Sequence, residues 1–190
     1  MDFIISINIV IFLVLLMIGV IYSINERTRI VGLTNFQIDK ETLSVFFIMG
    51  IVGAGIMFLV FLTNKEFGFI QIESTNDYIS TVKQIPENFI SAFNEEILFR
   101  VFVFLALFHL SGNKLIALVV SSLIFCLLHA PEDLIGILSY FIAGLMYGLA
   151  FLKLKSIWAA VGLHFTWNYF QGAIFGFPVS KSLHKVILIL

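Results

Sequence analysis

Three short clusters of polar residues interrupt an otherwise apolar chain, and the first of them contains two adjacent carboxylates. Glu96 and Arg100 are four residues apart, so on a helix they lie on one face and can pair. Glu95 is rotated from Glu96 by about 100° around the same helix, so the arginine need not neutralise it. One carboxylate can therefore be structural while the other stays available for chemistry.

The other two clusters place imidazole and amide groups on separate segments. His129 ends an apolar run, four residues after Phe125, and His164 lies one helical turn before Asn168 on the same face. None of these polar side chains has a partner within its own predicted helix. Because an unpaired polar group buried in lipid costs several kcal/mol, we expect the clusters to converge in the interior of a helix bundle.

A glutamate, two histidines and an asparagine around one pocket supply the parts needed to hydrolyse an amide. Glu95 can act as a general base that takes a proton from water, while His129 orients that water or shares its proton. His164 and Asn168 can donate hydrogen bonds to the carbonyl oxygen as it becomes an oxyanion, which is worth roughly 3–4 kcal/mol per donor. No hydroxyl residue shows a nucleophile elbow or Ser/Lys spacing, so we favour activated water without a cofactor.

Other interpretations of the same residues stay open. Glu95, Glu96 and Arg100 could form an ion-pair network that only holds helices together. Two histidines and a glutamate are also a legitimate set of three zinc ligands, although the chain has no HExxH spacing and Asn168 suits an oxyanion donor better than a metal ligand. The clusters could instead build a proton pathway, or line the cavity of a non-catalytic immunity or scaffold protein that binds a peptide.

The composition predicts that membrane helices position these clusters. Of the 190 residues, 60% are hydrophobic and 12% are charged, and the mean hydropathy is +1.06. A bilayer core of roughly 30 Å needs about 20 apolar residues per helical crossing. We therefore predict an all-α fold, a polytopic transmembrane helix bundle with about six membrane helices, as a single domain over residues 1–190. The predicted helices cover residues 3–24, 43–63, 86–110, 115–128, 134–152 and 157–177.

Charge, cysteine content and glycine spacing limit the binding partners and covalent links that this chain could have. A net charge of −1 without a basic run argues against nucleic acid, and a single cysteine, Cys126, precludes an intrachain disulfide. Glycines one turn apart, at 144 and 148 and at 172 and 176, favour close helix packing within the bundle or a homodimer. The short loops favour a multi-pass protein of a prokaryotic plasma membrane, and their charges leave the orientation open.

Taken in order, these motifs resemble those of the CPBP family, also called the Abi family, which contains the CAAX prenyl endopeptidases and the bacteriocin-processing or immunity proteins. The motif residues are Glu95, Glu96 and Arg100, then Phe125 and His129, and then His164 and Asn168, within residues 86–172. The resemblance implies a metal-independent, glutamate-dependent intramembrane endopeptidase that acts on a membrane-associated peptide or protein. It would make Glu95 the base, His129 the water-positioning residue, and His164 and Asn168 the oxyanion donors. The other three motif residues would have supporting roles.

Overall fold

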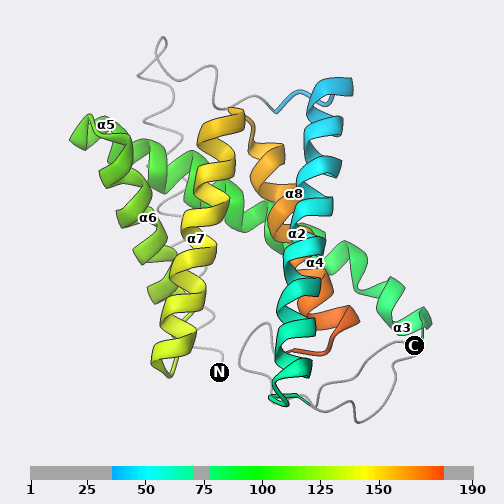
Figure 1. Ribbon diagram of the computed structural model, residues 1–190. Coiled ribbons are helices and arrows are strands. Elements are labelled where there is room, and N and C mark those ends of the chain that lie inside the picture. The colour runs from blue at the N-terminus through cyan, green and yellow to red at the C-terminus, as the bar shows by residue number, and fades with distance from the viewer. Residues whose placement is uncertain (1–35, 71–77, 178–190) are drawn as a thin grey trace, which may run out of the picture. The chain divides into compact units, whose positions relative to one another are not determined.

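A computed structural model describes residues 36–70 and 78–177, and within them every element of regular structure is a helix (Figure 1). The all-α prediction is thereby confirmed for this part of the chain. The predicted helix over residues 3–24 lies outside it. In chain order the elements are α2 (Lys40–Glu66), α3 (Tyr78–Lys83), α4 (Ile85–Glu96), the π-helix η1 (Ile97–Phe104), α5 (Leu105–Ser111), α6 (Lys114–Leu128), α7 (Leu134–Leu154), α8 (Ile157–Asn168) and the π-helix η2 (Tyr169–Ile174).

Polar N-caps start three of these helices. Asp39 accepts a hydrogen bond from the Thr42 N–H at 2.8 Å, which holds the pKa of the Asp39 carboxyl below its usual value, and the Thr42 hydroxyl bonds back to the Asp39 N–H. Asn113 accepts from two backbone N–H groups in the first turn of α6, and Asp133 caps α7 by accepting from the Gly136 N–H. Gly112, with φ +64°, ends α5, so a short turn separates α5 from α6.

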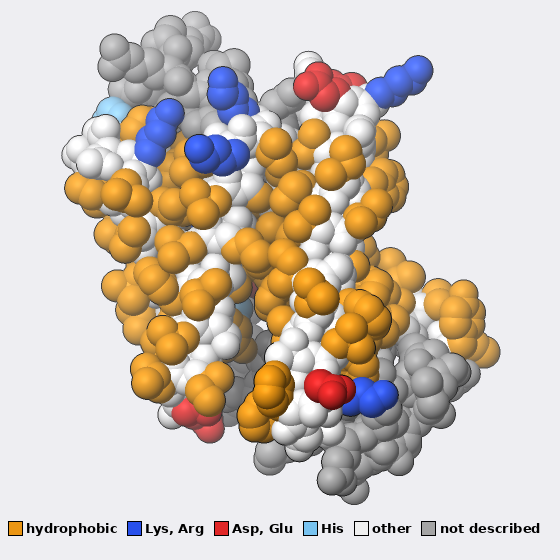
Figure 2. All heavy atoms as spheres, in the orientation of Figure 1, with side chains coloured by type: hydrophobic (Ala, Val, Ile, Leu, Met, Phe, Trp, Pro, Cys, Tyr) orange, Lys and Arg blue, Asp and Glu red, His pale blue; other side chains and the backbone are white. Residues whose placement is uncertain are grey.

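Two helices in the described part of the chain are long and apolar enough to cross a membrane. They are α2, with 27 residues, and α7, with 21 residues, and both fit a membrane protein. Their exposed surfaces are covered with hydrophobic side chains, and charged residues lie near the helix ends (Figure 2). The predicted count of six spans is not confirmed. α6 has 15 residues, and the predicted helices 86–110 and 157–177 are each divided by a change from α-helix to π-helix.

The chain divides into two compact units, which are described separately. The first contains Glu95–Ile157, and therefore η1 and α5 to α7. Here α6 and α7 run side by side (Figure 1), and Gly144 lets the backbones approach, because a Cβ on it would lie 3.0 Å from the Cα of Ser122. Phe99, Phe104, Phe125, Tyr147 and Phe151 are almost fully buried in this unit.

The second unit contains Gln37–Asn94 and the described residues from Trp158 on. α2 packs on α8, because a Cβ on Gly53 would lie 2.5 Å from the carbonyl oxygen of Leu163, and a Cβ on Gly162 would clash with the backbone of Phe46. Further along α2, Phe61 stacks on Phe175 with 4.5 Å between ring centroids. Small residues at the crossing and aromatic rings beyond it hold this pair of helices together.

Candidate active site

The adjacent glutamates lie where the helix changes its winding. Glu95 and Glu96 are the last two residues of α4, and η1 follows them directly. Pro86 lies in the first turn of α4, where its missing N–H leaves no hydrogen bond unmade. π-Helical segments are rare and occur often at functional sites. The apolar pattern of residues 86–110 contains no signal for the change, because a uniform α-helix would bury much the same residues.

Glu96 and Arg100 form the predicted ion pair. The Arg100 Nε lies 2.7 Å from the Glu96 Oε2, and both side chains are 0% exposed. The guanidinium carbon also lies 5.8 Å from the centre of the Phe125 ring, a cation–π distance. A charge that is fully buried costs free energy unless an opposite charge lies beside it. Removal of either the Glu96 carboxylate or the Arg100 guanidinium would therefore leave the other as an unpaired buried charge. Glu96 therefore has a structural role at the start of η1.

Glu95 faces His129 instead. The Oε2 of Glu95 lies 3.5 Å from the Nε2 of His129, and the two side chains are 27% and 22% exposed. The Nδ1 of His129 lies 2.8 Å from the carbonyl oxygen of Phe125, which can only accept, so Nδ1 carries a proton that it donates. Nε2 is consequently the ring nitrogen that can exchange a proton with Glu95 or with a water molecule between the two side chains.

The chain turns sharply after His129, which is the C-cap of α6. Ala130 has φ +47°, in the left-handed region where helices commonly end, and Pro131 cannot continue the helix. The helix therefore ends with the imidazole beside its own last turn, at hydrogen-bonding distance from a backbone carbonyl. The predicted position of His129 at the end of an apolar helix is confirmed.

Two aromatic rings lie against the His129 imidazole. The Phe125 ring is 4.3 Å away between centroids, and the Tyr140 ring from α7 is 4.5 Å away with 27° between the ring planes. Phe125 also meets Phe99 of η1 edge-on at 4.9 Å. Phe125 was expected from the motif. Tyr140 was not, because its contact with His129 depends on how α6 and α7 align.

His164 and Asn168 lie one turn apart in α8, in the second unit. His164 is 2% exposed, and Asn168 is the last residue of α8, immediately before η2. A change from α-helix to π-helix thus follows this motif as it follows Glu96. The structure brings Glu95 and His129 together within the first unit. The convergence of that pair with His164 and Asn168 stays a prediction.

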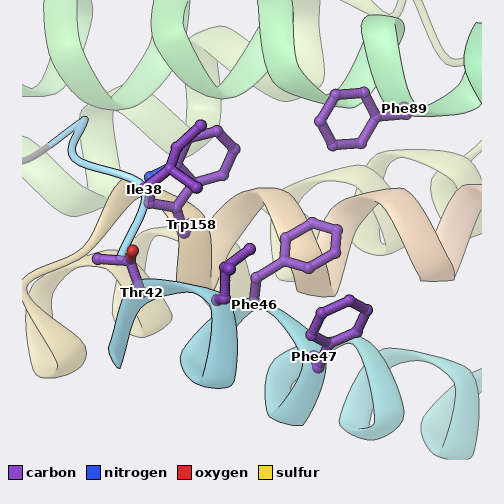
Figure 3. Close-up of a pocket in the computed structure, with 7 residues that line it drawn as sticks. Ile38, Thr42, Phe46, Phe47, Phe89 and Trp158 are labelled. Atoms are coloured by element: carbon purple, nitrogen blue, oxygen red, sulfur yellow. The ribbon is translucent and has the colours of Figure 1, made fainter. Parts of the chain in front are cut away.

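Within neither unit do the described side chains form a group of three or more His, Cys, Asp or Glu residues that could hold a metal ion. The second unit does contain an apolar pocket of about 210 Å³ (Figure 3). Large apolar side chains line most of it, from the residue Ile38 before α2 and from α2, α4 and α8, together with Thr42 of α2. The large ones are Ile38, Leu43, Phe46, Phe47, Phe89 and Trp158. This lining can hold an apolar group but offers no acid or base.

Comparison with known proteins supports the resemblance drawn from the motifs. Residues 82–170 match the sequence model of the family described as type II CAAX prenyl endopeptidase Rce1-like, which belongs to the CPBP family. This segment is CPBP-like. It contains all seven CPBP motif residues, from Glu95 to Asn168. The CPBP-like segment includes α4 to α8 and the start of η2, and therefore both sides of the predicted site.

One curated relative is the UPF0177 protein YvdC of Lactococcus lactis subsp. lactis (strain IL1403). It is 24% identical over 131 residues, which is 63% of this chain and 49% of that protein. The matched part of the chain thus spans about half the length of this relative. No solved structure shows a significant match. The matched family model is that of a membrane-embedded prenyl endopeptidase, while the activity, substrate and chemical steps of this chain are matters for proposal.

Proposed function

We propose that this chain is a multi-pass intramembrane endopeptidase that cleaves a membrane-associated peptide or protein with water activated by Glu95. The observation that carries the proposal is the placement of the Glu95 Oε2 3.5 Å from the His129 Nε2, while His129 Nδ1 is committed to the Phe125 carbonyl. The two groups are close enough to handle one water molecule, and a carboxylate has about four lone-pair sites, so Glu95 can accept from a water as well as from a neighbouring side chain. The CPBP-like segment supports the same reaction class.

The reaction follows from the roles of four side chains. Glu95 accepts a proton from water as the water oxygen attacks the carbonyl carbon of the scissile peptide bond. His164 and Asn168 donate hydrogen bonds to the resulting oxyanion. The proton then passes to the amine nitrogen as the C–N bond breaks, which releases a carboxylic acid and an amine and restores the carboxylate. His129 holds the water through Nε2 and shares the proton in transit.

The experiment has two steps. Candidate substrates are found by comparing the termini of membrane peptides between cells that carry the wild-type protein and cells that carry Glu95→Gln. Cleavage of these peptides is then measured with both purified proteins in detergent. Glu95→Gln should lower kcat by about 10²–10⁴-fold, because it removes a general base. Asn168→Ala in the same assay should lower kcat by about 10²–10³-fold, because it removes one oxyanion donor. Glu87→Gln, in the exposed first turn of the same helix α4, is the matched control and should keep wild-type activity.

Two results would overturn the proposal. Full cleavage by Glu95→Gln would remove the glutamate mechanism, and a cellular phenotype that survives both Glu95→Gln and His129→Ala would favour a non-catalytic immunity or scaffold role. Exhaustive chelation tests the alternative that this chain is a zinc-dependent protease. The proposed mechanism expects cleavage to continue, whereas loss of cleavage that zinc restores would assign Glu95 and the histidines to a metal.

A further inference from the structure

Tyr140 occupies a defined position beside His129 because α6 and α7 pack in a fixed antiparallel register. A Cβ on Gly144 would lie 3.0 Å from the Cα of Ser122, closer than an ordinary van der Waals contact, and a Cβ on Gly148 would overlap the end of the Leu118 side chain. Nearer the turn, the Cys126 thiol donates to the Ile137 carbonyl at 3.3 Å. Tyr140 lies between Ile137 and Gly144 in this register, so it meets the end of α6.

The contact between Tyr140 and His129 is face to face. The ring centroids are 4.5 Å apart and the ring planes differ by 27°, which is a stacked arrangement. The Phe125 ring contacts the same imidazole at 4.3 Å. Rotation of the imidazole about its side-chain bonds is therefore opposed by an aromatic ring from each helix, while the Nδ1 bond to Phe125 sets the tautomer.

This arrangement matters because His129 Nε2 faces the Glu95 carboxylate, the group with which it would share a proton. A rotated imidazole would move Nε2 away from the Glu95 Oε2, and a displacement of about 1 Å in a catalytic group can cost roughly 100-fold in rate. The orientation of the imidazole therefore bears directly on the proton that the Glu95–His129 pair would handle.

We propose that Tyr140 is a positioning residue, whose ring stacks on the His129 imidazole and holds Nε2 toward Glu95. This inference rests on the proposed peptidase function and deepens it. The ring carries the role, so Tyr140→Phe should keep at least about half of the wild-type kcat. Tyr140→Leu should lower kcat by roughly 10- to 100-fold and change KM by less than about twofold, because substrate contacts are untouched. Phe141→Leu is the matched control, since Phe141 is the next residue of α7, rotated by about 100°.

A spectroscopic readout tests the stack without reference to activity. Protein with isotope-labelled histidine has four imidazole signals, and His129→Gln identifies the one that belongs to His129. Its Cε1 proton should be shifted by the ring current of Tyr140. The signal should move toward its ordinary position in Tyr140→Leu and stay in place in Tyr140→Phe and Phe141→Leu.

The outcomes separate this inference from the proposed function. If wild-type protein cleaves and Tyr140→Leu cleaves equally well, or if Phe141→Leu loses as much activity, the positioning role is wrong. If Tyr140→Phe loses as much as Tyr140→Leu, the hydroxyl acts rather than the ring, which also overturns it. An unmoved His129 signal in Tyr140→Leu would disprove the stack. If wild-type protein shows no cleavage at all, the proposed function fails, while the His129 signal still decides the stack.

Discussion

At the scale of single residues, two neighbouring glutamates differ entirely in their surroundings. Glu96 is fully buried against Arg100, whereas Glu95 is 27% exposed and faces an imidazole. The difference arises from the rotation of about 100° between consecutive helical positions, which sends adjacent side chains in different directions. The two adjacent glutamates therefore lie in different environments within one turn, Glu96 in a buried ion pair and Glu95 beside an imidazole.

This difference predicts opposite consequences for the same substitution at the two positions. Glu96→Gln leaves the Arg100 guanidinium buried without its carboxylate, and should lower the free energy of unfolding by about 3–5 kcal/mol. Glu95→Gln should leave stability close to wild type. Thermal unfolding of the purified protein in detergent measures both. A Glu96→Gln variant as stable as wild type would contradict the structural role of this ion pair.

At the scale of elements, glycines decide how closely helices approach. Gly144 and Gly148 face α6 within the first unit, so the prediction of internal helix packing is confirmed for this pair. The homodimer remains untested. Gly176 of the second predicted pair has φ +67°, so its glycine is needed for the turn after η2. Equal spacing in the sequence thus serves two different structural purposes.

Two glycines of α2 offer a test with a matched control. A Cβ on Gly53 would lie 2.5 Å from both the Leu163 carbonyl oxygen and the Thr166 Oγ1 of α8, whereas a Cβ on Gly55 would meet no atom within 4 Å. Gly53→Ala should therefore destabilise the protein by about 1–3 kcal/mol through overpacking. Gly55→Ala should be neutral or stabilise by up to about 1 kcal/mol, because alanine favours the helix. Equal unfolding temperatures for the two variants would show that α2 and α8 do not pack this closely.

At the scale of the whole molecule, the lengths of α6 and α7 bear on how many of the predicted helices could cross a bilayer. α7 is about 32 Å long and matches a bilayer core of about 30 Å, whereas α6 is only about 22 Å long. The two helices nevertheless run side by side and are joined by a short turn. If α6 begins below the membrane surface, or if the bilayer is thinner beside it, the pair of helices can still cross the bilayer and return.

Labelling of introduced cysteines tests this crossing, since the native Cys126 is fully buried and gives little background. Lys114→Cys and Lys153→Cys, near the start of α6 and the end of α7, should react with a membrane-impermeant maleimide from one side of the membrane. Glu132→Cys, in the turn between α6 and α7, should react from the other side. Reaction of all three from the same side would show that this helix pair does not span.

Much of the candidate site follows from local sequence patterns. The Glu96–Arg100 pair depends on a spacing of four residues within one helix, and His129 ends a helix because Ala130 and Pro131 follow it. Such features involve residues close in the chain, so helical geometry alone determines them. The divisions at η1 and η2 were missed, because hydrophobic periodicity does not distinguish a π-helical turn from an α-helical one.

Sequence patterns alone predict a helical, apolar chain, an ion pair between Glu96 and Arg100, and motifs that resemble those of CPBP proteins; the structure confirms the helices and the ion pair for the residues that it describes. The convergence of Glu95 with His129 was expected, but its 3.5 Å distance and the stacking of Tyr140 on the imidazole come from tertiary packing. Both contacts join residues on different helices, and the Tyr140 stack depends on the α6–α7 register, which the close approach of Gly144 to Ser122 favours. Such contacts depend on how the side chains of two helices fit together, and the hydrophobic periodicity of one helix does not contain that information.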